Sequence, residues 1–149
     1  MNGNYREALC YFDTNILVYL FDKADPAKQR LSKDLMLHFH RKRTGRISVQ
    51  VIAEWRNVMI KKFGQFVDKD VRRRFIKHLG GWKPFAISPT ILLKADELCD
   101  RYTFSPYDSI HVQCALELGC QYLLSEDMQD GLVVDRALTL CNPYKRLVP

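Results

Sequence analysis

A short apolar run near the amino terminus, closed by a carboxylate, most constrains how this chain can fold. Residues 8–12 are almost continuously apolar, and Asp13 follows them directly. A run of this length without polar alternation is typical of a strand covered on both faces, as in a parallel sheet. Parallel strands need long crossovers, and residues 14–21 and 26–43 both have helical patterns. The sequence therefore predicts that the chain begins as an α/β protein.

Strands and helices continue to alternate along the rest of the chain. We expect helices over residues 50–62, 66–79, 89–102 and 105–118, strands at residues 47–49, 85–87 and 122–124, and one or two short strands between residues 132 and 140. This alternation predicts a three-layer α/β/α sandwich around a mainly parallel central sheet. A length of 149 residues suits one domain, so we expect a single domain over residues 1–149.

The composition indicates the class of partner and the compartment. The net charge of +6 favours partners that carry negative charge, such as nucleic acid or an acidic protein. The five cysteines are odd in number and form no CxxC pair, which predicts reduced thiols rather than disulfides or a zinc site. His111, Cys114 and Cys120 are accordingly expected to be ordinary packing residues. Because no apolar run is long enough to span a membrane and no signal peptide is evident, we expect a soluble cytoplasmic protein.

Four carboxylates stand at positions where each also has an ordinary structural explanation. Asp13 could simply cap the helix that follows it, and Ser105 with Asp108 completes a capping-box pattern. Glu54 lies at the edge of an apolar helical stripe, where polar residues usually border a solvated face. Asp127 belongs to an acidic turn that could be merely solvated. None of these signals is specific by itself.

The positions of these carboxylates relative to the predicted strands suggest a common site. In open α/β sheets ligands bind beyond the carboxyl ends of the strands, and Asp13 and Asp127 both follow predicted strands. Thr14 and Asn15 come next to Asp13 and could orient it or a bound water. Carboxylates gathered at one edge repel each other strongly, and hard divalent cations such as Mg²⁺ or Mn²⁺ offset that repulsion.

Several stretches of the sequence resemble the acidic signatures of PIN-domain nucleases, in matching order and spacing across nearly the whole chain. They are Tyr11-Phe12-Asp13-Thr14-Asn15, the helical Glu54 after a short strand, Ser105-Pro106-Tyr107-Asp108-Ser109, and Leu123-Leu124-Ser125-Glu126-Asp127-Met128-Gln129-Asp130-Gly131. The late Asn142-Pro143-Tyr144 is similar to a common ending of these domains. The strongest likeness is to the VapC-type toxins of type II toxin–antitoxin pairs.

The resemblance implies a fold, an activity and partners. It implies a PIN-like α/β/α domain that hydrolyses RNA with one or two Mg²⁺ or Mn²⁺ ions and leaves a 5′-phosphate and a 3′-hydroxyl. VapC-type proteins act on tRNA or ribosomal RNA, are usually homodimers, and are held inactive by a cognate antitoxin protein. No membrane partner is implied.

The resemblance also assigns roles to residues by position. Asp13, Glu54, Asp108 and Asp127 take the catalytic acidic roles, Asp13, Asp108 and Asp127 are the expected metal ligands, and Thr14, Asn15 and Ser125 are the supporting polar residues. The last signature is ambiguous, because Glu126 and Asp130 offer alternative carboxylates.

An acidic centre needs basic residues around it to bind RNA. The candidates for phosphate contact are Arg41, Lys42, Arg43, Arg46, Lys61, Lys62, Arg72 and Arg73. Most single charges of this kind only solvate helix faces, so the prediction concerns the group rather than any one residue. The four histidines are scattered, and they offer no acid–base pair for cleavage through the ribose 2′-hydroxyl.

Three other functions remain open at this level. A housekeeping PIN nuclease in RNA processing would carry the same acids without an antitoxin. A non-catalytic RNA-binding PIN module would not need all four acids. A phosphatase with an aspartate nucleophile commonly has a second Asp two residues after the first, where this chain has Asn15.

Overall fold

The central feature of the computed structural model, which describes residues 4–147, is a five-stranded mixed sheet. Its strands are β1 (Cys10–Phe12), β2 (Gly45–Arg46), β3 (Tyr122–Leu124), β4 (Val133–Val134) and β5 (Leu138–Cys141). They lie in the order β2-β1-β3-β5-β4, and every neighbouring pair is parallel except β4 with β5. The predicted mainly parallel sheet is therefore confirmed.

Strand β1 occupies the interior position that its composition predicts. It pairs with β2 on one side and with β3 on the other, and Cys10, Tyr11 and Phe12 are all 0% exposed. The paired segment is shorter than the predicted run of residues 8–12, because Ala8 and Leu9 precede the ladder. Because β1 is buried and paired on both edges, its last residue, Phe12, has a fixed position, and Asp13 follows it directly.

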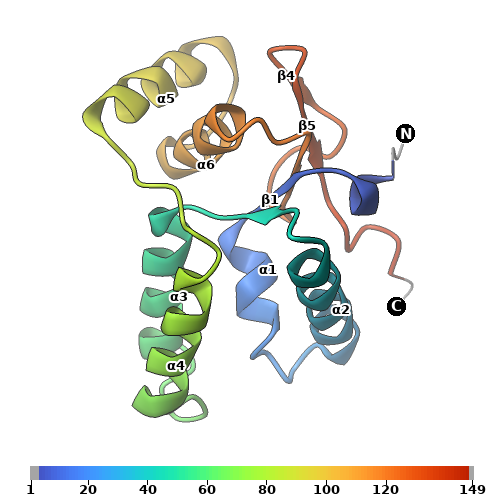
Figure 1. The fold of residues 1–149 in the computed structure, drawn as a ribbon, viewed down its shortest axis with the longest axis vertical. Coiled ribbons are helices and arrows are strands. Elements are labelled where there is room, and N and C mark those ends of the chain that lie inside the picture. Colours follow the sequence, from blue (N-terminus) through green and yellow to red (C-terminus); the bar gives the residue numbers. More distant parts are fainter. Residues whose placement is uncertain (1–3, 148–149) are drawn as a thin grey trace.

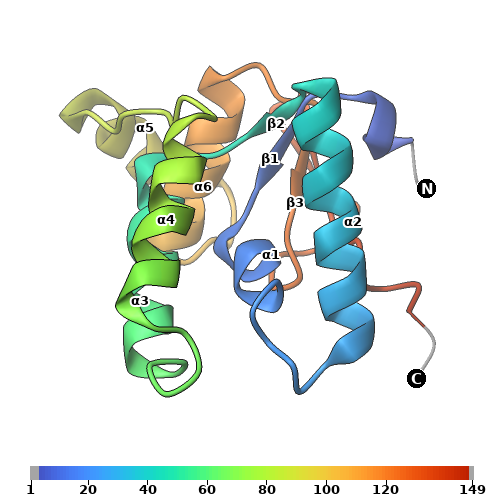
Figure 2. The same ribbon diagram turned by 60° about the horizontal axis from the view of Figure 1, so that its bottom comes forward.

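Helices cover both faces of the sheet. They are α1 (Thr14–Tyr19), α2 (Pro26–Lys42), α3 (Val49–Lys61), α4 (Lys69–Gly80), α5 (Pro89–Arg101) and α6 (Pro106–Glu117), preceded by the short 3-10 helix η1 (Tyr5–Glu7). Figure 2 shows α2 on one side of the strands and α6 on the other. This arrangement confirms the predicted three-layer α/β/α sandwich. No helix within residues 4–147 is long and apolar enough to cross a membrane.

Side-chain caps explain where several helices begin. Asp13 accepts a hydrogen bond from the amide of Thr14 at the start of α1, and Ser105 caps α6. Helix α4 begins at Lys69, later than predicted, because Asp68 accepts from the amides at its first turn and leaves residues 66 and 67 outside. The cap therefore decided this boundary, which the apolar periodicity had placed too early.

Two predicted strands differ from the observed structure. The segment expected at residues 47–49 pairs earlier, as Gly45–Arg46, because Ser48 caps α3 and ends the extended segment. The strand expected at residues 85–87 is reduced to one bridge between Ser48 and Phe85. The two short strands expected near the carboxyl terminus are present as β4 and β5.

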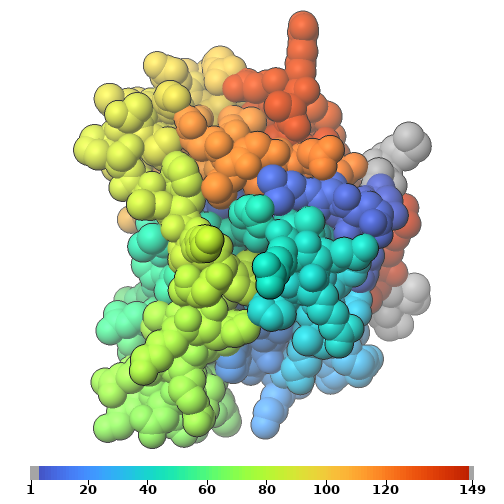
Figure 3. Space-filling model, in the orientation of Figure 1, coloured from blue at the N-terminus to red at the C-terminus, as the bar shows by residue number. Residues whose placement is uncertain are grey.

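Helices α3 and α4 form a pair that extends away from the sheet, as Figure 1 shows. In the space-filling view the side chains of α4 lie directly beside those of the last part of α2 (Figure 3). The contact includes the rings of His40 and His78, whose centroids are 5.4 Å apart, and His40 also stacks with Trp82. The α3–α4 pair is thus anchored to the domain at its α2 side.

Candidate active site

Asp13 occupies the carboxyl end of β1, where it is 5% exposed. One carboxylate oxygen accepts the Thr14 amide at 2.7 Å, and the other accepts the Ser125 hydroxyl at 2.6 Å. Burial raises the pKa of this carboxyl, and the nearby charge of Asp108 raises it further, although its hydrogen bonds and His111 oppose the change. Asp13 is therefore a well-oriented carboxylate held in an environment that disfavours its own negative charge.

Glu54 extends from α3 toward the same point and is half-buried. Its carboxylate accepts the hydroxyl of Thr14 at 2.7 Å and the side-chain amide of Gln50 at 2.9 Å. Thr14 therefore links α1 to α3, which places Glu54 beside Asp13. The position at the edge of the apolar stripe of α3 directs Glu54 into this junction rather than toward solvent.

His111 joins the two carboxylates, and the prediction that it is an ordinary packing residue was wrong. Its ring is 1% exposed, and its Nε2 lies 3.1 and 3.2 Å from the two oxygens of Glu54 and 3.7 Å from Asp13 Oδ1. Its Nδ1 lies 2.8 Å from the hydroxyl of Tyr11, which lies 2.7 Å from the hydroxyl of Ser48. His111 follows Asp108 by three residues on α6, and this spacing was the sequence signal that could have identified it.

The attraction between Glu54 and His111 lowers the pKa of Glu54 and raises that of His111. Burial tends to raise the pKa of Glu54, but the hydrogen bond and charge of His111 hold it below its usual value. Burial tends to lower the pKa of His111, but the hydrogen bond to Glu54 and the charges of Asp13, Glu54 and Asp108 raise it. The two shifts describe one attraction between neighbouring groups.

Asp108 and Asp127 form the more exposed side of the cluster. Asp108 lies in the first turn of α6, where its amide donates to the Ser105 hydroxyl at 3.2 Å, and its side chain is half-buried. Burial raises the pKa of Asp108, and the charges of Asp127 and Glu54 raise it further. Asp127 is exposed and accepts the side-chain amide of Asn15 at 2.9 Å.

Ser125 connects the two sides of the cluster. It donates its hydroxyl to Asp13 and accepts the backbone amide of Asp127 at 3.2 Å. Strand β3, which ends at Leu124, carries Ser125 to the edge where β1 delivers Asp13. The structure thus brings the predicted supporting residues Thr14, Asn15 and Ser125 into contact with the acids.

Glu126 and Asp130, the alternative acids of the last signature, lie outside this cluster. Glu126 forms an ion pair with Lys28 and accepts the hydroxyl of Tyr19. Asp130 accepts the amide of Asn142 at 2.8 Å and lies 3.3 Å from Lys145 Nζ. Both carboxylates serve to hold the turn against neighbouring segments, which leaves Asp127 as the member of this turn that faces Asp108.

The candidate RNA-binding residues fall into two groups. The first group is Arg41, Lys42, Arg43 and Arg46, and it lies on the end of α2, the turn that follows and β2, whose Gly45 pairs with Cys10 at the start of β1. Lys42 is near Glu7, and Arg46 donates to the carbonyls of Arg43 and Gly45, away from the cluster. The second group is Lys61, Lys62, Arg72 and Arg73 on the extending α3–α4 pair.

The donor set fits a hard divalent cation. One ligand atom each from Asp13, Glu54 and His111 lies within 4.8 Å of the others. Asp108 interacts electrostatically with all three, and Asp127 interacts with Asp108. Oxygen atoms dominate this set, as Mg²⁺ and Mn²⁺ prefer. Burial is the main cause of the raised pKa values of Asp13 and Asp108, and neighbouring carboxylates add to both shifts.

The fold and the site together define an α/β protein with an acidic centre at the carboxyl ends of parallel strands. The family described as PIN domain matches residues 10–129, which include all of these acids. The chain therefore belongs to the PIN-domain family, whose members are typically nucleases that depend on divalent metal ions. A comparison with curated proteins gave no significant match.

Proposed function

We propose that this chain is a Mg²⁺- or Mn²⁺-dependent endoribonuclease that hydrolyses phosphodiester bonds. The observation that carries the proposal is the cluster at the sheet edge, where one ligand atom each from Asp13, Glu54 and His111 lies within 4.8 Å of the others and Asp108 lies close enough to interact with Asp13. Carboxylates gathered in this way repel one another, so their grouping favours a cation-binding role. The family match supports nuclease chemistry at this point.

Asp13, Asp108 and Asp127 are the proposed metal ligands. When bound, the cation would activate water and stabilise the negative charge that develops on the phosphate. Ser125 and the Thr14 amide fix both oxygens of Asp13, which limits its rotation before any ligand arrives. Asn15 fixes one oxygen of Asp127 in the same way.

We assign His111 to orienting Glu54 rather than to the metal. Its Nε2 lies within hydrogen-bond distance of both Glu54 oxygens, and its Nδ1 is already paired with Tyr11. In the neutral ring with Nε2–H donating to Glu54, Nδ1 accepts a hydrogen bond from the Tyr11 hydroxyl, which can accept one from Ser48. Glu54, so oriented, is the proposed base or water-positioning group beside the ligands of the cation.

Lys61, Lys62, Arg72 and Arg73 are the proposed phosphate contacts. They lie on the pair α3 and α4, and α3 also supplies Glu54. RNA that lies along this pair would reach the acidic centre, whereas RNA bound at Arg41, Lys42, Arg43 and Arg46 would contact the opposite end of the strands. Contacts of this kind give salt-sensitive binding with little sequence information.

We also propose that the protein is the toxin of a toxin–antitoxin pair and that it acts as a cytoplasmic homodimer on tRNA or ribosomal RNA. This proposal rests on the resemblance of its signatures to those of VapC-type toxins. We expect expression without a partner to slow bacterial growth, and Asp13→Asn to relieve the effect. Normal growth during soluble wild-type expression would contradict the toxin role, while leaving the nuclease activity to be tested in vitro.

The decisive experiment for the enzyme compares wild type, Asp13→Asn and the control Asp96→Asn on total cellular RNA. Asp96 is exposed on α5, outside the acidic cluster. We expect cleavage by wild type and Asp96→Asn only with Mg²⁺ or Mn²⁺, and none with chelator or with Asp13→Asn. Cleavage that survives chelation, or equal cleavage by Asp13→Asn, would refute the proposed chemistry.

A further inference from the structure

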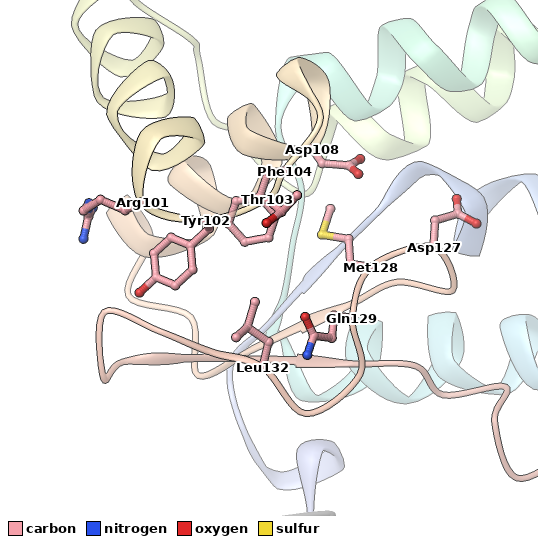
Figure 4. Close-up of a pocket in the computed structure, with 9 residues that line it drawn as sticks. All are labelled: Arg101, Tyr102, Thr103, Phe104, Asp108, Asp127, Met128, Gln129 and Leu132. Carbon is pink, nitrogen blue, oxygen red and sulfur yellow. The ribbon is translucent and has the colours of Figure 1, made fainter.

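A pocket adjoins the exposed side of the acidic cluster, and the nuclease chemistry proposed above makes no use of most of it. It is lined by Arg101, Tyr102, Thr103, Phe104, Asp108, Asp127, Met128, Gln129 and Leu132. Figure 4 shows the carboxylates of Asp108 and Asp127 at one end and the side chains of Arg101 and Tyr102 at the other. The pocket therefore leads directly away from two of the proposed metal ligands.

Apolar side chains supply part of the pocket's lining, which is polar over most of its surface. Met128 is 8% exposed, and Phe104 and Leu132 are partly buried against the core. The ring of Phe104 lies 5.5 Å from that of Tyr102, with an interplanar angle of 31°. These surfaces could contact the face of a flat, neutral group.

An ion pair fixes the far end of the pocket. The guanidinium of Arg101 donates to both carboxylate oxygens of Asp135, and the hydroxyl of Tyr102 donates to one of them at 3.2 Å. The amide of Asp135 donates back to the Tyr102 hydroxyl at 3.0 Å. The chain segment that carries Thr103 and Phe104 is therefore held in place at its start.

Two polar side chains of the pocket have no polar partner within residues 4–147. They are the hydroxyl of Thr103 and the side-chain amide of Gln129, and Figure 4 shows them on different sides of the pocket, beside Phe104 and beside Leu132. An amide can both donate and accept along one edge, as can a hydroxyl. Such groups recognise the edge of a base when an apolar or aromatic surface holds its face.

The charge of the lining excludes an anionic occupant. Arg101 is the one cation among the described lining residues, and Asp135 occupies its guanidinium. Asp108 and Asp127 would repel a phosphate or a carboxylate that entered without a metal ion. The lining therefore favours a neutral occupant over an anionic one.

We propose that this pocket receives an unpaired nucleobase of the RNA next to the scissile phosphate, and that Thr103 and Gln129 make cleavage depend on that base. The inference rests on the proposed function, because it takes the phosphate at Asp108 and Asp127 as its starting point. Thr103 and Gln129 are specificity-determining residues in this proposal, and they take no part in the hydrolysis itself.

The first test maps cleavage sites in a random-sequence RNA pool with Mn²⁺. Wild type is compared with Thr103→Val and Gln129→Leu, and with the matched controls Thr90→Val and Gln65→Leu, whose side chains are exposed outside the pocket. We expect wild type and both controls to prefer one base at a single position beside the cut, and the pocket variants to lose about tenfold of that preference. Identical base distributions for all five proteins would overturn the proposal.

The second test does not need catalysis, so it separates failure of the pocket from failure of the proposed enzyme. Glu54→Gln, which removes the proposed base and keeps the proposed metal ligands, is titrated in Mn²⁺, alone or combined with Gln129→Leu. The titrants are short single-stranded RNAs in which one nucleotide is replaced by an abasic residue, moved along the strand. We expect one abasic position to weaken binding about tenfold for Glu54→Gln but not for the double variant. Equal affinities at every position would overturn the proposal even if metal-dependent cleavage is observed.

Discussion

The two sides of the acidic cluster differ in burial and in support. The inner carboxylates, Asp13 and Glu54, receive hydrogen bonds from neighbouring side chains and contact the buried His111. The outer carboxylates, Asp108 and Asp127, line an open pocket and have few partners. Similar residue types thus occupy a rigid environment on one side and an accessible environment on the other.

This difference in burial matches two requirements of the site, which are orientation of the metal ligands and access for the substrate. A cation needs ligands that are oriented before it arrives, and the inner side supplies orientation through links between β1, α1, α3 and α6. A polymeric substrate needs access, and the outer side supplies it beside the pocket. Predictions that weaken one side at a time can show whether this division holds.

The largest expected effect comes from the inner side. Asp13→Asn should lower cleavage by about a thousandfold or more at every Mn²⁺ concentration, because a stabilisation of several kcal/mol is lost with the ligand. Rates on a short RNA, measured across a Mn²⁺ titration, test this expectation. Recovery of the wild-type rate at high Mn²⁺ would show that the loss of Asp13, like that expected for Asp127, can be compensated by more cation, and would contradict the expected difference.

The next effect concerns His111. His111→Leu removes the donor to Glu54 and should lower kcat by about 10–100-fold, whereas His111→Gln retains a donor and should recover part of the loss. Circular dichroism shows whether each variant is folded, and separate values of kcat and KM show whether the loss lies in the chemical step. The exposed His78→Leu is the control. If both substitutions at His111 reduce kcat equally in folded protein, the orienting role is wrong.

A smaller effect is expected from the outer side. Asp127→Asn should lower cleavage by about tenfold and be partly compensated by more Mn²⁺, because the remaining ligands still hold the cation. Its neighbour provides the control: Glu126→Gln should keep wild-type cleavage and lose about 1 kcal/mol of stability with the Lys28 pair. A larger loss of cleavage from Glu126→Gln than from Asp127→Asn would reverse the assignment.

The smallest effect is one of stability. The folded-state pKa of Asp13 is raised, so the native protein keeps a proton that the unfolded chain has already lost. The free energy of unfolding therefore falls as pH rises through the window between the two pKa values. In chelator above that window, Asp13→Asn should melt a few degrees higher than wild type, and added Mn²⁺ should stabilise wild type alone. Equal melting temperatures in chelator would show that burial of this charge has no net cost.

The sequence predicts most of the fold because its signals are local. The continuous apolar run before Asp13 identified β1, and Ser105 marked the start of α6. The start of α4 was predicted three residues too early, because the amphipathic pattern continues before Asp68, the residue that caps the helix. Where two local signals compete, the cap is the stronger guide to a helix boundary.

The site was less predictable because its contacts cross long stretches of sequence. His111 receives its role from Tyr11 and Glu54, and Tyr11 lies 100 residues away. In the acidic turn, Lys28 and Tyr19 draw Glu126 away from the cluster. Side-chain direction in that turn depends on these distant residues, so the sequence alone left the choice among its acids open.

Ser48 links the start of α3 to the hydrogen bonds around His111. Its hydroxyl caps the first turn of α3 through the amide of Val51, and it is also the last group in the connection through Tyr11 to His111. Fraying of that turn would therefore remove the Ser48 contact of Tyr11 and loosen the helix that carries Glu54. Hydrogen exchange at the start of α3 would measure how often this turn opens.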